Sequence, residues 1–251
     1  MNIELFKQAV ASLFGDLLKQ YEGGDEYALY EYGPQTVGRI GYATNITPEI
    51  VEQAAAQKVD MIISHHDAWD FVFGMKEECH TLLKRYGINH YFIHAPLDYA
   101  DFGTCHSLFK ALGINKIIRQ STEHDNRSIP GIGELDDPLT FEELVDKVRL
   151  VLDEDVKSWK NIDNRIKRVG IITGAGNSNI SIRDALHAGC DVYITGEKTL
   201  YTVQYAKFAG INLIVGSHTF TEIFGVRALC DLLKEKFGDL EILQLQEEHL
   251  E

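Results

Sequence analysis

The sequence of 251 residues has few cysteines, no long apolar run and no excess of basic residues. The four cysteines, Cys79, Cys105, Cys190 and Cys230, are far apart and form no C-x-x-C pair. This argues against a disulfide framework and a thiolate zinc site, so we expect reduced, mostly packed thiols. No stretch approaches the roughly 18 continuous apolar residues of a membrane span. The N-terminus, MNIELFKQAV, lacks the apolar core of a signal peptide. We therefore expect a soluble, cytoplasmic protein without a membrane partner.

Acidic residues outnumber basic ones, with 38 Asp and Glu against 24 Lys and Arg, which gives a net charge of −14. Nucleic acids and anionic membranes are bound through clustered Lys and Arg, so this balance argues against direct binding of nucleic acid. It is compatible with binding of divalent cations. Hydrophobic residues make up 45% of the chain and charged residues 25%. That mixture is typical of a globular protein and excludes disorder for most of the chain.

Strands and helices are expected to alternate along most of the chain. Helices are expected at residues 3–20, 48–57, 76–86, 104–112, 141–152, 180–188, 199–208 and 221–236, and strands at 37–43, 59–64, 89–94, 114–118, 169–173, 192–195, 211–215 and 240–245. Such alternation predicts an α/β fold with mostly parallel sheets covered by helices. The polar stretch 119–138, which contains two prolines, is interpreted as a change of lobe.

The most informative feature is the pair His65-His66, which directly follows the apolar run 59–64. In open α/β sheets, ligands gather at the carboxyl ends of the strands. The chain leaves the pleat at that point, so both imidazoles can turn toward one pocket. The pair therefore indicates a metal site, and the alternative is a chance His-His in a loop.

Two further strand ends carry residues that can bind a metal. His94 and Asp98 follow one apolar strand, with a helix cap or a solvated carboxylate as the alternative for Asp98. His218 and Glu222 follow another strand and share one face if that segment is helical, with a simple helix start as the alternative. Imidazole with carboxylate suits zinc, iron, manganese, cobalt or nickel. A glutamate can also bridge two cations about 3.5–4 Å apart.

Short stretches spread over most of the chain match a known family in order and spacing. These stretches are Thr47-Pro48-Glu49-Ile50-Val51, Ile62-Ile63-Ser64-His65-His66, His94-Ala95-Pro96-Leu97-Asp98, Val169-Gly170-Ile171, Gly174-Ala175-Gly176, Tyr193-Ile194-Thr195-Gly196-Glu197, Gly216-Ser217-His218 and Thr221-Glu222. With them the sequence resembles the dinuclear-metal proteins of the Ngg-interacting-factor-three-like family. Many members of that family are called GTP cyclohydrolase I type 2 homologues.

The resemblance implies a two-metal centre. Its ligands would be His65, His66, Asp98, His218 and Glu222, with Glu222 between the two ions. His94 falls beside the site, so His94 and Glu222 are the expected catalytic residues. Two divalent ions per chain are implied, with zinc, iron or manganese expected.

The resemblance also implies the architecture and the assembly. We expect two interlaced α/β lobes, the first formed by residues 1–118 and 211–251 and carrying the metal site, the second by residues 119–210. Family members commonly form hexameric rings, so a homohexamer is expected.

The implied function is a dinuclear metal-dependent hydrolase with a small-molecule substrate. The reaction would be GTP cyclohydrolase-type ring opening, or hydrolysis of a related nucleotide or heterocyclic metabolite. One alternative is a non-catalytic, metal-binding regulatory or scaffold protein, and another is metal storage or delivery. Departures from the family pattern include Asp67 in place of proline, Ala95-Pro96 inside the second motif and Ser217 inside the last. These departures affect residues expected to face the substrate more than they affect the expected metal ligands.

Two weaker signals lie near these motifs. Trp69, Phe71 and Phe73 follow the histidine pair. They are expected to line a pocket wall or pack between lobes, and stacking on a bound ring is the alternative. The glycine-containing loop 174–178 lies between a strand and a helix. It is expected to be a tight turn, with a phosphate cradle as the alternative.

Overall fold

A computed structural model describes residues 1–250 and divides the chain into two compact units. Unit 1 contains Met1–Ala100 and Val226–Glu248, and unit 2 contains Asp101–Gly225 with the residues after Glu248. The expected lobes changed at 118/119 and 210/211. The structure differs because β5 (Lys116–Arg119) and β12 (Asn212–Val215) both belong to the sheet of unit 2.

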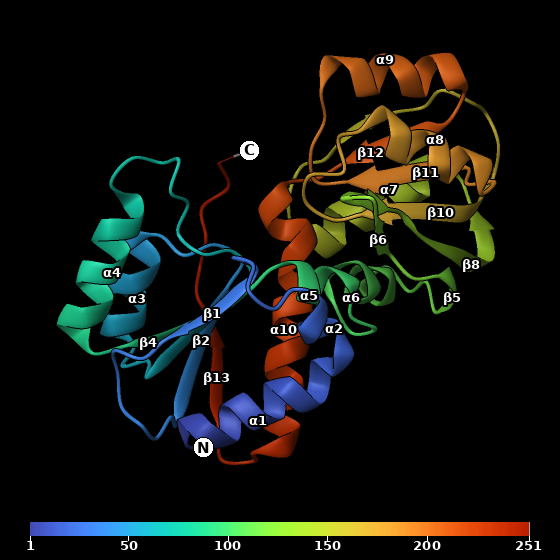
Figure 1. Cartoon of the computed structure of the whole chain (residues 1–251). Helices are drawn as coiled ribbons and strands as arrows, with labels where there is room; N and C mark the ends of the chain where they lie inside the picture. The colour runs from blue at the N-terminus through green and yellow to red at the C-terminus, as the bar shows by residue number, and fades with distance from the viewer. Residues whose placement is uncertain (251) are drawn as a thin grey trace. The chain divides into compact units, whose positions relative to one another are not determined.

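Unit 1 is built around a five-stranded sheet with the strand order β1-β4-β3-β2-β13 (Figure 1). The strands are β1 (Tyr27–Tyr30), β2 (Arg39–Ala43), β3 (Met61–Ser64), β4 (Asn89–Ile93) and β13 (Glu241–Gln244). The pairs β4–β3, β3–β2 and β2–β13 are parallel, and only β1 runs antiparallel to its neighbour. The carboxyl ends of β2, β3 and β4 therefore meet at one edge of the sheet.

Helices cover both faces of this sheet. They are α1 (Ile3–Phe14), α2 (Asp16–Gln20), α3 (Pro48–Ala56), α4 (Met75–Tyr86), α5 (Ala95–Tyr99) and the later part of α10 (His218–Lys236). Figure 1 shows α3 and α4 together on one face, where Val51 and Leu83 pack with Ile62 of β3. The helix expected at 3–20 is two helices, because Gly15 adopts a positive φ of 55° that ends the first.

Unit 2 contains a six-stranded sheet with the order β5-β8-β10-β11-β12-β9. Besides β5 and β12, its strands are β8 (Gly131–Leu139), β9 (Lys157–Trp159), β10 (Ile166–Ile172) and β11 (Val192–Thr195). The pairs β10–β11 and β11–β12 are parallel, and the outer pairs are antiparallel. A separate hairpin is formed by β6 (Thr122–His124) and β7 (Arg127–Ile129). The predicted α/β class is thus confirmed.

The core of unit 2 has two layers, one on each face of the sheet. Its helices are α6 (Thr104–Ala111), α7 (Phe141–Leu152), α8 (Asn179–His187) and α9 (Leu200–Ala209). Val192 and Ile194 of β11 pack in the cluster that contains α6 and α7 residues, whereas Tyr193 packs in the cluster of α8 and α9. This follows from the two-residue period of a strand, which sends alternate side chains to opposite faces.

The polar stretch 119–138, interpreted from the sequence as a change of lobe, supplies a hairpin and most of β8. The glycines of this stretch misled the sequence interpretation. In β8 they are needed because neighbouring side chains leave no room for a Cβ atom. A Cβ on Gly133 would lie 2.6 Å from Ile114 Cγ2, and one on Gly131 would lie 2.7 Å from Cys105 Sγ. Glycine at these two positions allows helix α6 to pack close to the sheet.

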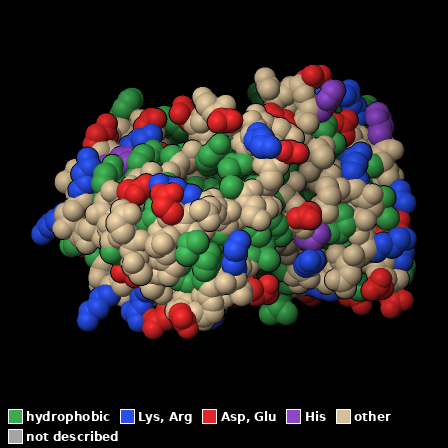
Figure 2. Space-filling model, turned by 60° about the horizontal axis from the view of Figure 1, so that its bottom comes forward, with side chains coloured by type: hydrophobic (Ala, Val, Ile, Leu, Met, Phe, Trp, Pro, Cys, Tyr) green, Lys and Arg blue, Asp and Glu red, His purple; other side chains and the backbone are tan. Residues whose placement is uncertain are grey.

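Other global features agree with the sequence. Among residues 1–250, no helix is long and apolar enough to cross a membrane. All four cysteines are free and buried, as predicted. Figure 2 shows acidic and basic side chains mixed over the face that it presents.

One buried histidine beside β3 makes the stability of unit 1 depend on pH. His90 of β4 is fully buried, and its Nε2 lies 2.8 Å from Ser64 Oγ. The Ser64 hydroxyl donates to the His66 carbonyl, so its oxygen accepts the Nε2–H of a neutral His90. Burial lowers the pKa of His90 from 6.5 to about 4. The unfolded chain therefore binds a proton between these values that the folded chain excludes.

The contribution of His90 to stability is accordingly complete above pH 6.5 and is lost as the pH falls toward 4. We expect metal-free wild-type protein to lose about 2 kcal/mol more unfolding free energy than His90→Gln between pH 7 and pH 4.5. Urea titrations of both proteins at the two pH values measure this. Equal acid losses in the two proteins would contradict the assignment.

Candidate functional site

The turn after β3 brings the two adjacent histidines to the same side of the chain. The backbone N–H groups of His65 and His66 both donate to the Thr44 carbonyl, at 3.0 and 2.9 Å. This shared acceptor takes the chain out of the pleat, in which neighbouring side chains would point to opposite faces. The centroids of the two imidazole rings lie 4.6 Å apart. The predicted convergence of the pair is therefore present in unit 1.

In unit 1, each of the three clustered histidines, His65, His66 and His94, is held through its Nδ1 by an oxygen. His65 Nδ1 lies 2.9 Å from the Ile93 carbonyl oxygen, and His94 Nδ1 lies 2.7 Å from Glu26 Oε2. These oxygens only accept, so each Nδ1 carries the proton and Nε2 is left as the nitrogen that can bind a metal. The same contact lowers the pKa of Glu26. One ring nitrogen from each of His65, His66 and His94 lies within 4.8 Å of the others.

The third histidine is oriented through an amide whose own direction is fixed. His66 Nδ1 lies 2.8 Å from Asn45 Oδ1, and Asn45 Nδ2 donates to Glu247 Oε1 at 2.9 Å. The Glu247 carboxylate also accepts the backbone N–H groups of Thr44 and Asn45. The segment after β13 thus locks the Asn45 amide with its oxygen toward His66.

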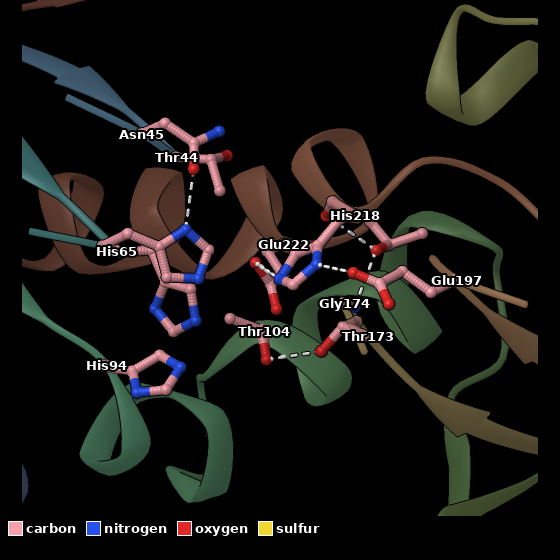
Figure 3. Close-up of polar contacts among 12 residues, drawn as sticks. Thr44, Asn45, His65, His94, Thr104, Thr173, Gly174, Glu197, His218 and Glu222 are labelled. Carbon is pink, nitrogen blue, oxygen red and sulfur yellow. Dashed lines mark hydrogen bonds and ion pairs between the residues drawn. The ribbon is translucent and has the colours of Figure 1, made fainter. Parts of the chain in front are cut away.

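Asp98 adds a carboxylate to this group. It lies in α5, one turn after His94, and its oxygens are 3.3 Å from His65 Nε2 and 4.0 Å from His94 Nε2. An Nε2 lone pair and a carboxylate oxygen repel each other at such distances unless a cation lies between them. A metal ion or an added proton on the imidazole satisfies this requirement. Figure 3 labels His65 and His94 of this group, together with Asn45, whose Oδ1 contacts His66 Nδ1.

Unit 2 contains a second group with the same design. His218 is the first residue of α10, and its Nε2 lies 3.3 Å from Glu222 Oε2, one turn along the helix. Its Nδ1 lies 2.7 Å from Glu197 Oε1 (Figure 3). The other oxygen of Glu197 accepts from Asn177 Nδ2 at 2.6 Å. Burial alone would lower the pKa of His218, but the two carboxylates outweigh it and raise the pKa to about 10. This imidazole sits in a cation-attracting environment.

The loop after β10 lies directly against this second group. Gly174 has a φ of +60°, and its N–H donates to Thr221 Oγ1 at 2.9 Å. A Cβ at Gly174 would overlap Glu222 Oε1 and lie 2.8 Å from His218 Nε2. Glycine is therefore required for the carboxylate and imidazole to keep their places. The loop acts here as a close-packed turn, as the sequence favoured.

The structure brings His65, His66, His94 and Asp98 together in unit 1, and His218 and Glu222 together in unit 2. Sequence reasoning missed Glu26, Asn45 and Glu247, which orient the first group. Glu26 directly precedes β1, a strand that carries no clear alternation, and Glu247 lies some 200 positions from its partners. Of the three, only Asn45 lies close to a feature that the sequence indicates, because it shortly precedes Thr47, the N-cap of α3.

Imidazole and carboxylate donors with oxygen acceptors behind the imidazoles are the typical surroundings of divalent transition metals. The fold and the two groups define an α/β protein equipped to bind such ions. The chain belongs to the Duf34/NIF3 (NGG1p interacting factor 3) family, whose model matches residues 18–249. This confirms the resemblance inferred from the sequence.

Known proteins similar to the chain cover nearly its whole length. A protein of Haemophilus influenzae named GTP cyclohydrolase 1 type 2 homolog is 29% identical over 94% of both chains. One of the same name from Pyrococcus horikoshii is 30% identical over 88% of this chain and 89% of its own. Among solved structures, protein ybgI, of unknown function, has a TM-score of 0.83 at 24% identity and 99% coverage of both chains. A Bacillus cereus protein related to NIF3 has a TM-score of 0.80 at 16% identity, covering 100% of this chain and 98% of its own. These structural matches support the fold.

Proposed function

We propose that this protein is a dinuclear metal-dependent hydrolase acting on a nucleotide or a related heterocyclic metabolite. The proposed ligands are His65, His66, Asp98, His218 and Glu222, which hold two divalent ions of zinc, iron or manganese. The main support is the orientation of the histidines. Two of them, His65 and His218, have Nδ1 bonded to an oxygen and Nε2 at 3.3 Å from a carboxylate oxygen, that of Asp98 or Glu222.

Divalent ions held there would supply Lewis-acid chemistry and lower the pKa of nearby water. The chain's own contribution to proton transfer is assigned to His94. Its Nδ1–H is held by Glu26, which aims Nε2 toward the other donors. An imidazole backed by a carboxylate is well suited to accept a proton and return it. Glu222, which is 3% exposed, is the proposed second catalytic residue and would help to hold the ions.

The substrate class comes from the relatives. Several are named GTP cyclohydrolase 1 type 2 homolog, so ring opening of GTP is the specific reaction to test first. As parts of the same proposal, the protein forms a homohexameric ring, as the family resemblance implies, and works in the cytoplasm. Four free, buried cysteines fit a reducing compartment.

Metal removal tests the proposal. We expect elemental analysis of the purified protein to find two divalent ions per chain, and dialysis against a chelator to abolish turnover. Returning the ion found in the native protein should restore the rate, whereas Mg²⁺ should not, because imidazole ligands disfavour it. GTP and a panel of nucleotides and heterocycles serve as substrates. Full activity after complete metal removal would refute the hydrolase mechanism, and two ions without any turnover would support a non-catalytic metal protein instead.

A further inference from the structure

A cavity of about 410 Å³ in unit 1 opens beside two of the metal-donor histidines. His66 and His94 both line it. The remaining walls come from the segment before and within β1, from the loop that follows His66, from β4 and from the start of α4. The volume lies within the range of pockets that hold small organic ligands. A molecule bound there would touch the imidazoles with one edge.

Several aromatic rings line this cavity. Tyr30 and Phe92 lie nearly parallel, with centroids 6.3 Å apart at 24°. Trp69 and Phe71 form a second near-parallel pair, 5.5 Å apart at 18°, and Trp69 also contacts His66 at 5.6 Å. Flat rings in near-parallel pairs offer faces on which another flat ring can stack. Trp69 is 37% exposed and Phe71 is 73% exposed, so their faces are accessible.

The charges that line the cavity disfavour a phosphate inside it. The charged side chains are Asp25, Asp67, Asp70 and one cation, Lys76. Lys76 Nζ is already held by Asp67 Oδ2 at 3.0 Å and by Asp70 Oδ1 at 3.3 Å. Tyr30 donates its hydroxyl to Asp67 Oδ2 as well. The carboxylates exceed the ammonium groups, so the cavity favours a neutral or cationic ring that carries N–H donors.

We propose that this cavity binds the base of the substrate, a planar amino-substituted heterocycle of the guanine type, and leaves any phosphates outside. This inference rests on the proposed function, because it assigns to that site its substrate class. The ring stacks on the aromatic walls, its amino groups face the acidic side chains, and its edge reaches His66 and His94.

The experiment uses guanosine, which carries the base without phosphate, and the full-length protein kept metal-free by a chelator. Calorimetric titration should show saturable binding of guanosine and none of inorganic triphosphate. Phe71→Ala should weaken guanosine binding about tenfold through the loss of one stacking face. Phe73→Ala is the matched control, because Phe73 is in the same loop, is 98% exposed and does not line the cavity.

A second readout uses the fluorescence of Trp69. The chain has two tryptophans, Trp69 and Trp159, so Trp159→Phe leaves Trp69 as the sole reporter. Guanosine should quench this emission with the affinity measured by calorimetry. The pocket proposal is overturned if guanosine does not bind, if inorganic triphosphate binds instead, or if Phe71→Ala and Phe73→Ala have equal effects.

The two proposals can fail separately. Two metal ions per chain together with no guanosine binding would overturn the pocket and keep the metal site. Guanosine binding by a protein that takes up no metal would overturn the hydrolase and keep the pocket.

Discussion

At the proposed metal site, replacing Glu222 by Gln is expected to reduce the bound metal from two ions per chain to about one and to lower the proposed hydrolytic rate on the order of a hundredfold. Gln keeps the size of the side chain but removes the negative charge with which Glu222 would hold cations at the proposed site. The Glu222 side chain is 3% exposed, so solvent cannot compensate for the loss of its charge. Elemental analysis and the rate with restored metal measure the two effects.

The same substitution has a consequence in the metal-free protein. Glu222 and Glu197 together raise the pKa of His218 to about 10. Removing one carboxylate should bring this pKa down toward 6.5, which NMR titration of the imidazole would detect. Glu235→Gln is the matched control, because Glu235 lies on the same helix and is exposed. If the Glu222 variant kept two ions and its rate, Glu222 would not be a ligand.

Much of the local structure could be predicted because its causes are local. Thr47 accepts the N–H of Ile50 and starts α3 at Pro48, as the sequence indicates. Thr140 and Glu143 form the capping box that starts α7. The apolar run before His65-His66 is a strand, and both imidazoles leave it on one side. Short-range patterns of this kind depend on neighbours within four residues.

What escaped the sequence depends on distant partners. β1 is half-buried at an edge of its sheet, so it has no alternation to reveal it, and Glu26 was missed with it. Glu247 reaches Asn45 across some 200 residues, and no local pattern signals such a bond. In the sequence, the glycines of β8 resemble turn residues. In the structure, Phe109 and Ile114 lie so close to them that a Cβ atom would not fit. The predicted lobe boundaries differ from those of the two units because the boundaries depend on strand pairing between distant segments.

The orientation of donors is therefore the property that only the structure supplies. Sequence resemblance can name a histidine as a ligand, but which nitrogen it presents is set by the oxygen behind the other one. In this protein those oxygens come from a backbone carbonyl, an amide and two carboxylates, in four different parts of the chain.

Gly174→Ala is expected to lower metal binding and activity about as much as Glu222→Gln, although residue 174 carries no donor. The added Cβ would overlap Glu222 Oε1 and approach His218 Nε2 to 2.8 Å, so both donors must move. A displacement of about 1 Å at a positioned group can cost on the order of a hundredfold in rate. The substitution should also destabilise the fold by about 1–2 kcal/mol through the positive φ alone.

Gly23→Ala separates these two effects. Gly23 has a φ of +82° and open space around its Cβ position, so alanine there introduces backbone strain without touching a donor. We expect it to lower the unfolding free energy and to leave the metal content and the rate unchanged. Adding Gly174→Ala to a Glu222→Ala protein should reduce metal content less than Gly174→Ala does alone, because the overlapping carboxylate is already gone and only the contact with His218 Nε2 remains. Additive losses in the double variant would mean that Gly174 acts on the site by a route other than Glu222.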